Sequence, residues 1–204
     1  MFVVVEGIEG SGKSTLIAGL AEHLRSAGYP VVVTREPGGT RVGNAIREVF
    51  LSNANAMAPL TESLLVNAAR AQHVFEVIRP ALATERIVLC DRFTDSTLAY
   101  QGHGRGLSLE TLRELCAIAT RGLQPDLVLL LDVPVEVARS RLKERPTADR
   151  IEAEGDAFHE RVRRGFLELA IEQGHRILDG TRPSDSVLKE ALEEVRACLG
   201  IRVP

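Results

Sequence analysis

The sequence contains no tryptophan, only 4% aromatic residues and only three cysteines, and its formal net charge is −3. Proteins that bind nucleic acids use aromatic side chains to stack on bases and basic surfaces to contact phosphates, so this composition argues against a nucleic-acid partner. Cys90, Cys116 and Cys198 are far apart and odd in number. Their spacing argues against a disulfide framework or a zinc site and predicts reduced thiols in the cytoplasm.

Long apolar runs are also missing. No run is long enough to span a bilayer, and no basic segment precedes the apolar residues at the start of the chain. We therefore expect no membrane partner and no signal peptide. The 204 residues are 45% hydrophobic and 26% charged, which is ordinary for a globular protein and predicts a single domain over residues 1–204.

The most informative segment is Gly7-Ile8-Glu9-Gly10-Ser11-Gly12-Lys13-Ser14, which follows the apolar run 2–5 and matches the pattern G-x-x-x-x-G-K-[ST]. Glycines let successive backbone N–H groups face one concavity, and the helix that follows adds the positive end of its dipole. Lys13 places an ammonium near the outer phosphates, and the Ser14 hydroxyl can ligate Mg²⁺. A flexible glycine turn would explain the glycines but not the adjacent lysine and serine. The segment therefore predicts a nucleotide-phosphate site.

Apolar runs typical of buried strands alternate with helical patterns along the chain. The expected strands are 2–6, 31–34, 87–90, 127–131 and 176–178. The expected helices are 13–27, 42–51, 60–83 (which Pro80 can interrupt), 109–120, one that starts at Pro134, 156–173 and a last one through 187–199. Nearly pure apolar strands separated by helices predict an α/β protein with the three-layer P-loop NTPase fold. Its five-stranded parallel sheet would be covered by helices on both faces.

Polar residues follow three of these strands, at the edge where parallel sheets bind their ligands. They are Glu36-Pro37, Asp91-Arg92 and Asp132. Asp91 can place a carboxylate near Mg²⁺, and Arg92 can place a guanidinium on a phosphate. A solvated ion pair at the end of a strand is the alternative. Beside a phosphate-binding loop we favour the first interpretation.

Two irregular segments carry several charges or glycines. The basic stretch 143–150 fits either a solvated surface or a mobile lid that closes over phosphates, and we favour the lid. The glycine-rich stretch 102–106 does not follow a strand and lacks the spacing of a dinucleotide-binding loop. We therefore expect it to be a flexible loop.

Polar side chains on two expected helices have two explanations each. Arg70 lies on the long helix beside Asn67 and fits either an exposed helix arginine or a ligand-binding one. Thr97, Tyr100 and Gln101 can share one helical face, and from the residues alone we favour a polar helix surface over a binding site. For Arg70 the residues alone leave both alternatives open.

Several motifs together resemble the bacterial type of thymidylate kinase. Besides the phosphate-binding loop preceded by Glu6, they are Thr34-Arg35-Glu36-Pro37-Gly38-Gly39-Thr40, Asp91-Arg92-Phe93, Tyr100-Gln101-Gly102 and Asp149-Arg150-Ile151-Glu152. They occur in the family's order and cover nearly the whole chain. The loop is shared by many families, whereas the Arg-Glu-Pro-Gly-Gly-Thr and Ala-Tyr-Gln-Gly segments are much more specific. The resemblance implies transfer of the ATP γ-phosphoryl group to the 5′-phosphate of dTMP, with Mg²⁺, by a chain that forms a homodimer.

The resemblance also implies a role for each matching residue. The ATP-binding residues are Gly7, Ile8, Glu9, Gly10, Ser11, Gly12, Lys13, Ser14, Thr15, Arg139 and Arg182. The dTMP-binding residues are Glu9, Glu36, Pro37, Arg70, Arg92, Thr97, Tyr100 and Gln101. The catalytic residues are Lys13, Arg92, Arg145 and Arg150, the last two on a lid over about 143–153. The metal-binding residues are Ser14, Glu9 and Asp91.

Three residues depart from the family pattern. Val66 stands where an aromatic residue usually stacks on the thymine, Ala69 where an acid often precedes the helix arginine, and Ile151 where some relatives have tyrosine. These departures bear on the affinity for the acceptor more than on the fold or the reaction. Another nucleoside monophosphate or deoxynucleoside kinase is the alternative function. A P-loop switch that binds nucleotide without transferring phosphoryl groups is a second one.

Overall fold

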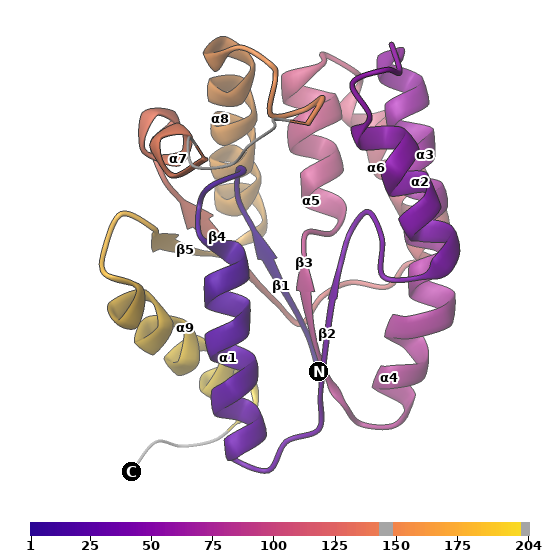
Figure 1. Ribbon diagram of the computed structural model, residues 1–204. Helices are drawn as coiled ribbons and strands as arrows, with labels where there is room; N and C mark the ends of the chain where they lie inside the picture. Colours follow the sequence, from indigo (N-terminus) through magenta and orange to yellow (C-terminus); the bar gives the residue numbers. More distant parts are fainter. Residues whose placement is uncertain (143–148, 201–204) are drawn as a thin grey trace.

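The computed structural model describes residues 1–142 and 149–200, and Figure 1 shows them as a central sheet between helices. Within these residues the sheet has five parallel strands, hydrogen-bonded in the order β2-β3-β1-β4-β5. They are β1 (Phe2–Glu6), β2 (Val31–Arg35), β3 (Ile87–Asp91), β4 (Leu127–Asp132) and β5 (Arg176–Asp179). The expected parallel sheet is confirmed. Because β1 is central, the segment that follows it emerges between β3 and β4.

The helices follow the strands as the alternating pattern predicts. They are α1 (Lys13–Ser26), α2 (Arg41–Leu51), α3 (Pro59–His73), the π-helical segment η1 (Val74–Ile78), α4 (Arg79–Ala83), α5 (Thr94–Thr97), the π-helical segment η2 (Leu98–Gly104), α6 (Leu109–Thr120), α7 (Val135–Leu142), α8 (Asp156–Gln173) and α9 (Ser184–Cys198). In the described part of the chain, no helix is both long and apolar enough to cross a bilayer.

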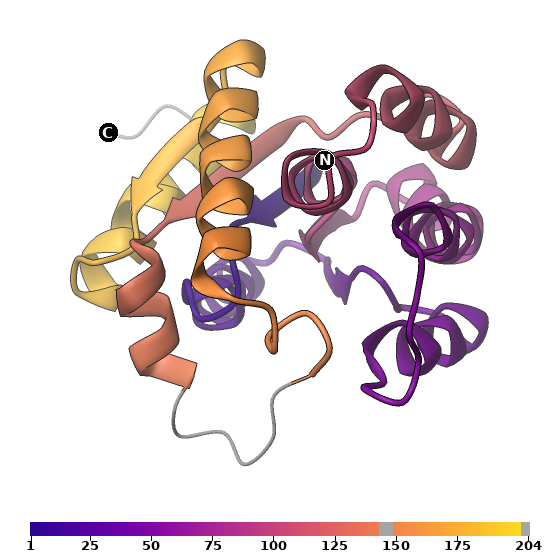
Figure 2. The ribbon, with the colours of Figure 1, turned by 90° about the horizontal axis from the view of Figure 1, so that it is seen from above.

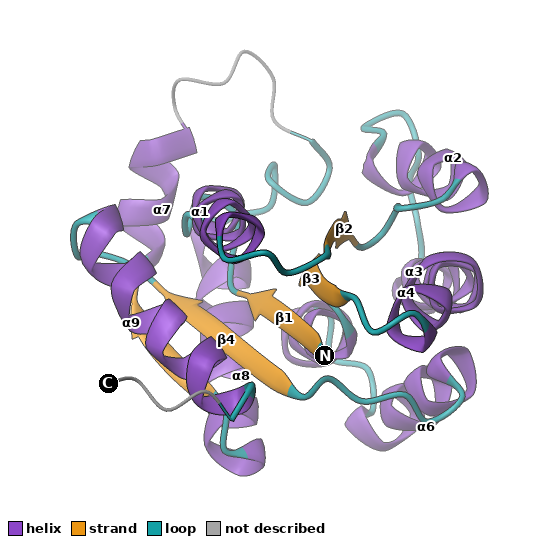
Figure 3. Ribbon diagram, turned by 90° about the horizontal axis from the view of Figure 1, so that it is seen from below, coloured by secondary structure: helices purple, strands orange, loops and turns teal. Residues whose placement is uncertain are grey.

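Alternating side chains of β1 pack into two separate hydrophobic clusters. Val3 and Val5 of β1 pack in a cluster with α1 and α9, whereas Phe2 and Val4 pack in a cluster with η1 and α4. This division follows from the period of two along a strand. A third cluster joins Leu130 of β4 to α8 and η2. Figures 2 and 3 show α1 and α8 on opposite sides of the sheet, so both faces are covered as expected.

Two helical regions differ from expectation. The helix over 60–83 is not interrupted at Pro80; instead α3 continues into η1, and Pro80 lies in the first turn of α4. Proline is tolerated there because that turn needs no amide donor from it. The expectation of a flexible loop is wrong for Gly102 and Gly104, which lie buried in η2. A Cβ atom on Gly102 would lie 2.4 Å from Leu109, and one on Gly104 would lie 2.7 Å from Phe158. These glycines serve close packing rather than flexibility.

The expected lid falls largely outside the structural description. Residues 143–148, which include Arg145, lie outside the described residues. The remaining part, 149–153, follows directly and is irregular. It begins the return of the chain to α8.

Candidate active site

The phosphate-binding loop connects β1 to α1 at the carboxyl end of the sheet. Gly10 has a φ of 75°, and a Cβ atom there would lie 2.4 Å from a backbone oxygen of α7, so the loop requires glycine. Lys13 is buried, and its Nζ donates to the carbonyl oxygens of Gly7 (3.0 Å) and Ile8 (2.9 Å). Burial, helped by the charge of Arg92, lowers the pKa of Lys13 to about 8. The loop therefore holds a desolvated ammonium group that donates hydrogen bonds to two neutral carbonyl oxygens.

Arg92 lies directly after β3 and has a φ of 70°, in the left-handed region that is uncommon for non-glycine residues. Its guanidinium donates to Ser96 Oγ (3.0 Å), Glu9 Oε1 (2.8 Å) and the Tyr100 hydroxyl (3.2 Å). The Tyr100 hydroxyl donates in turn to Glu9 Oε2 at 2.5 Å. Burial raises the pKa of Glu9, but the positive charges of Arg92 and Lys13 outweigh burial and keep this pKa below its usual value. Glu9 of the loop and Arg92 after β3 are thus joined directly and through the Tyr100 hydroxyl.

Glu6, the last residue of β1, positions the turn that carries Arg92. Its Oε1 accepts hydrogen bonds from the backbone N–H groups of Phe93 (2.8 Å) and Ser96 (3.2 Å). Its Oε2 accepts one from Ser96 Oγ at 2.6 Å. Burial, followed by the charge of Asp95, raises the pKa of Glu6 to about 7. The left-handed turn at Arg92 is therefore fixed by a carboxyl group that titrates near neutral pH.

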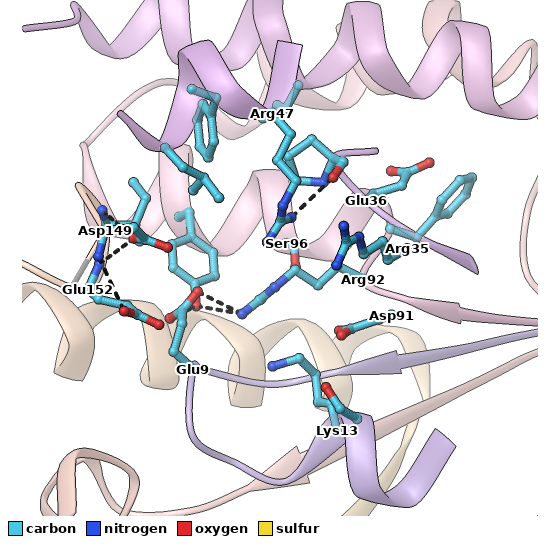
Figure 4. Close-up of a pocket in the computed structure, with 18 of the residues that line it drawn as sticks. Glu9, Lys13, Arg35, Glu36, Arg47, Asp91, Arg92, Ser96, Asp149 and Glu152 are labelled. Carbon is cyan, nitrogen blue, oxygen red and sulfur yellow. Dashed lines mark hydrogen bonds and ion pairs between the residues drawn. The ribbon is translucent and has the colours of Figure 1, made fainter. Parts of the chain in front are cut away.

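These groups border one cavity of about 520 Å³, within the usual size of small-molecule sites. The predicted residues that line it are Glu9, Gly10, Gly12, Lys13, Ser14, Thr15, Glu36, Pro37, Arg70, Asp91, Arg92, Thr97, Tyr100 and Gln101. Figure 4 shows Lys13 and Asp91 on one side of this space and Arg47 on the other, with Arg92 between them. Residues from distant parts of the sequence therefore meet in a single cavity.

Arg70 reaches the wall of this cavity from a buried network. Its Nε donates to Glu36 Oε2 (2.7 Å), and its two terminal nitrogens donate to Thr97 Oγ1 (3.0 Å) and the Phe93 carbonyl oxygen (2.7 Å). The other oxygen of Glu36 pairs with His73 Nδ1 at 2.9 Å. Arg70 is only 2% exposed, so the alternative of an exposed helix arginine is wrong. The network instead holds its guanidinium at the cavity.

Two arginines that the resemblance assigns to ATP do not line the cavity. Arg139 is half-exposed and pairs with Asp156, and Arg182 is half-exposed and pairs with Glu190 at 2.6 Å. Of the loop residues, Gly7, Ile8 and Ser11 are buried behind the cavity surface. Their contribution to the site is the shape of the backbone.

Arg150 also lies outside the cavity lining, although its neighbours Asp149 and Ile151 belong to it. Its guanidinium donates to the buried carboxylate of Glu62 and to the carbonyl oxygen of Phe50 (2.9 Å). The structure therefore shows Arg150 fastening the end of the expected lid to α2 and α3. It does not show Arg150 directed at a phosphate.

Three arginines at the cavity were not predicted as site residues. They are Arg35, Arg47 and Arg141. Arg47 donates to the Pro37 carbonyl oxygen at 3.1 Å, and Arg141 donates to the Ser11 carbonyl oxygen at 3.2 Å. Arg35 belongs to the segment 34–40, which is part of the family resemblance, so the sequence offered a signal that it lies at the site. Arg47 and Arg141 lie on ordinary charged helices, which offered none.

Asp91 suits a divalent cation. Its Oδ1 is buried and has no hydrogen-bond partner in the described part of the chain. Ser14 lines the same cavity, whereas both oxygens of Glu9 already bind Arg92 or Tyr100. The described residues contain no cluster of three or more histidine, cysteine or acidic side chains that could hold a metal alone. Mg²⁺ typically takes one or two protein oxygens and completes its shell with water and phosphates, so this donor set fits it.

Comparison with known proteins decides the family. A family model described as thymidylate kinase matches residues 5–191 of the chain. The chain belongs to the thymidylate kinase family.

Individual thymidylate kinases agree with this assignment along nearly the full length. The thymidylate kinase of Desulfovibrio desulfuricans is 48% identical and covers 98% of this chain and 96% of its own. That of Deinococcus radiodurans is 50% identical, with 93% of each chain covered. A crystal structure of thymidylate kinase from Ehrlichia chaffeensis matches with a TM-score of 0.79 and 33% identity, covering 96% of this chain and 98% of that one. The resemblance and the P-loop fold are confirmed.

The departures from the thymidylate kinase pattern lie in different surroundings. Val66 and Ile151 are buried, line the cavity and pack in the same cluster as Phe50. Phe50 also lines the cavity, so α2 supplies an aromatic side chain that sequence reasoning missed. Ala69 is fully buried and does not belong to the lining.

Proposed function

We propose that this protein transfers the γ-phosphoryl group of ATP to the 5′-phosphate of dTMP, giving ADP and dTDP. One observation carries the proposal: a single cavity is lined by the phosphate-binding loop with Lys13 and also by Arg92, Arg70 and Gln101. A loop of this type binds a nucleoside triphosphate. The second group offers cations and an amide to a smaller phosphorylated ligand. The thymidylate kinases to which the chain is similar support dTMP as that ligand.

The donor end holds the phosphates of ATP. The loop amides, Lys13 and Thr15 contact the phosphate oxygens, as expected for this loop. Ser14 and Asp91 are the proposed Mg²⁺ ligands, with Glu9 near the metal. When bound, Mg²⁺ neutralises negative charge on the phosphates.

The acceptor end needs no general base. A phosphate monoester has a second pKa of about 6 and is therefore mostly dianionic at neutral pH. Arg92 binds this dianion, and alignment with charge stabilisation accounts for catalysis. The loop contains no arginine, so we propose that Arg145 of the lid contacts the transferred group. We assign Arg150 to anchoring the lid, because it binds Glu62.

The nucleoside is recognised by side chains from α3, α5 and η2. Arg70 can only donate hydrogen bonds, so it suits O4 of thymine and opposes the amino group of cytosine. Gln101 meets the N3 edge, Thr97 lies beside the base, and Tyr100 crowds the 2′ position of the sugar. Glu36 and Pro37 border the pocket.

A panel of nucleoside monophosphates tests the proposal. With ATP and Mg²⁺, we expect dTMP to be phosphorylated faster than any other nucleoside monophosphate of the panel when the products are separated by chromatography. Equal rates with dTMP and dCMP would instead indicate a less selective monophosphate kinase. Calorimetry that detects ATP binding but no dTMP binding would indicate a P-loop module without transfer activity.

Two further proposals concern the state of the protein. We propose a homodimer, because Val42 and Val49 of α2 line a shallow groove and are exposed, and Leu64 of α3 is exposed as well. Sedimentation equilibrium tests this, and a monomer at micromolar concentration would contradict it. We also propose a reducing, cytoplasmic setting, which the three free cysteines support.

A further inference from the structure

Glu62 is a fully buried carboxylate that lies behind the acceptor end of the cavity. It belongs to α3, has 0% exposure and is not part of the cavity lining. Arg105 pairs with its Oε1 at 3.0 Å and donates to its Oε2 at 3.2 Å, and Arg150 also pairs with Oε1. Glu62 is therefore paired with two guanidinium groups, as buried carboxylates usually are. An ionised carboxylate can only accept hydrogen bonds.

The third donor to Glu62 is the side-chain amide of Gln101. Gln101 is 2% exposed and lines the cavity, and its Nε2 donates to Glu62 Oε2 at 3.1 Å. Turning the amide over would place its oxygen against a carboxylate oxygen, with no proton between them. The amide therefore has one permitted orientation. In that orientation Oε1, which makes no hydrogen bond within the described residues, is the acceptor left for a ligand.

The orientation of this amide decides which pyrimidine edge fits. Thymine and uracil carry a proton on N3, so their edge presents a donor there, whereas N3 of cytosine is an acceptor. An available Oε1 complements the N3–H group and opposes the cytosine lone pair. A reversed amide would do the opposite. Sites built around such a polar contact discriminate strongly, because the wrong ligand leaves a buried group unpaired.

We propose that Glu62 is a positioning residue that locks the Gln101 amide with its oxygen toward the base, and thereby selects keto pyrimidines over cytosine. Glu62 touches neither nucleotide. This inference rests on the proposed function and adds a residue that acts through Gln101. It also explains why a carboxylate rather than an amide is buried at this position.

The substitution Glu62→Gln tests the lock. The new amide should place its oxygen at the Oε1 position, where Arg150 and a terminal nitrogen of Arg105 both donate. Its NH₂ group then takes the Oε2 position, where it faces Gln101 and loses only the weaker hydrogen bond from Arg105 Nε. Gln101 should turn over to accept from it and should present Nε2 to the base. We expect the ratio of kcat/KM for dTMP to that for dCMP to fall by about tenfold or more, as for one exchanged buried hydrogen bond. The ratio of dTMP to dUMP should stay constant, because both bases carry N3–H.

Two controls separate this role from a structural one. Glu154 also pairs with Arg105, through its Oε1. Glu154→Gln removes the charge of this second partner and leaves the Glu62–Gln101 contact intact. It should not change the ratio of dTMP to dCMP. In a Gln101→Ala background, Glu62→Gln should no longer change this ratio. An equal loss with dTMP and dCMP, or an effect that persists without Gln101, overturns the proposal.

A measurement on the wild-type protein covers the case in which Glu62→Gln does not fold. With ¹⁵N-labelled glutamine, the side-chain amide protons of Gln101 should keep their slow exchange and their shifts when dTMP is added, because they stay on Glu62. Displacement of these protons by the base overturns the proposal. If the wild-type protein phosphorylates no monophosphate, the proposed function fails instead. A dTMP kinase whose ratio is unchanged in folded Glu62→Gln refutes only the lock.

Discussion

The ammonium group of Lys13 lies 2.9 Å from the carbonyl oxygen of Ile8, within the loop that is expected to bind the phosphates of ATP. It also lies 3.0 Å from the carbonyl oxygen of Gly7. Two backbone carbonyl oxygens of the loop therefore accept the hydrogen bonds that Lys13 would otherwise donate to phosphate oxygens. Binding of ATP must therefore exchange neutral oxygens for charged ones.

This exchange predicts proton uptake on ATP binding. The pKa of Lys13 is lowered to about 8 by burial and by the charge of Arg92, so a growing fraction is neutral as the pH rises through 8. Bound phosphate favours the charged form and raises this pKa again. Titration calorimetry at pH 8.5 in buffers of different ionisation enthalpy should therefore show protons taken up by the complex, and at pH 6.5 none through Lys13. The variant Lys13→Met should fold, lose turnover and show no uptake at pH 8.5; uptake that survives in it would assign the proton to another group.

A second prediction concerns Glu6 and the pH dependence of stability. Its pKa rises from 4.5 to about 7 in the folded protein, so the folded state binds more protons than the unfolded state between these values. The contribution of Glu6 to the free energy of unfolding therefore falls as pH increases from 4.5 to 7 and stays low above pH 7. Each pKa unit corresponds to about 1.4 kcal/mol, so a shift of this size corresponds to roughly 3 to 4 kcal/mol.

The variant Glu6→Gln isolates this effect, because glutamine does not titrate and can keep the contacts to Phe93 and Ser96. Relative to the wild type, its free energy of unfolding in urea should increase from pH 4.5 to pH 7. Glu22→Gln, on an exposed part of α1, is the matched control for the substitution itself. Wild-type and Glu6→Gln curves that run parallel across this range would show that Glu6 keeps an ordinary pKa.

Local patterns predicted the parts of the molecule that depend on neighbouring residues. The strands and the loop before Lys13 were placed within a residue or two, because apolar runs and glycine spacing act over short stretches. The π-helical segment η2 was missed because Gly102 and Gly104 suggested a loop. Their role depends on Leu109 and Phe158, which come from other elements and lie against the glycines.

The site shows the same division more sharply. Arg92 was predicted because it follows a strand directly, where parallel sheets bind ligands. Arg70 was ambiguous because its orientation depends on Glu36, 34 residues away, which accepts its Nε hydrogen bond. Arg141 was missed, and Arg139 was predicted in its place from the resemblance. Arg139 and Arg141 lie close together on α7 and differ in where their side chains point, which the structure shows and the sequence does not.

The neighbouring arginines on α7 supply a third prediction. Arg141 donates to the Ser11 carbonyl oxygen at 3.2 Å and to the Gly180 carbonyl oxygen at 2.9 Å, so it ties the phosphate-binding loop to the segment after β5. Arg139 instead pairs with Asp156 away from the cavity. We expect Arg141→Ala to weaken ATP binding about tenfold, because the loop loses its fastening and the cavity loses a cation. Arg139→Ala should change it less than twofold when both are measured by calorimetry. The reverse order would return the ATP role to Arg139.

The last prediction concerns the planar guanidinium group of Arg92, whose two terminal nitrogens form a fork. Its guanidinium binds Ser96 and Glu9 through different nitrogens, and the planar group still has the shape to take a phosphate in a bidentate manner. In Arg92→Lys the charge remains, and the left-handed backbone costs about the same for both side chains. One ammonium cannot hold Glu9, Ser96 and a phosphate together. We expect the melting temperature to change little and kcat to fall about 100-fold in a steady-state assay, as when one oriented donor to the transition state is removed. Ser96→Ala removes a single partner of the fork and should cost far less. A lysine variant with near wild-type turnover would mean that Arg92 acts as a simple point charge, and that its unusual backbone serves the turn held by Glu6 rather than the reaction.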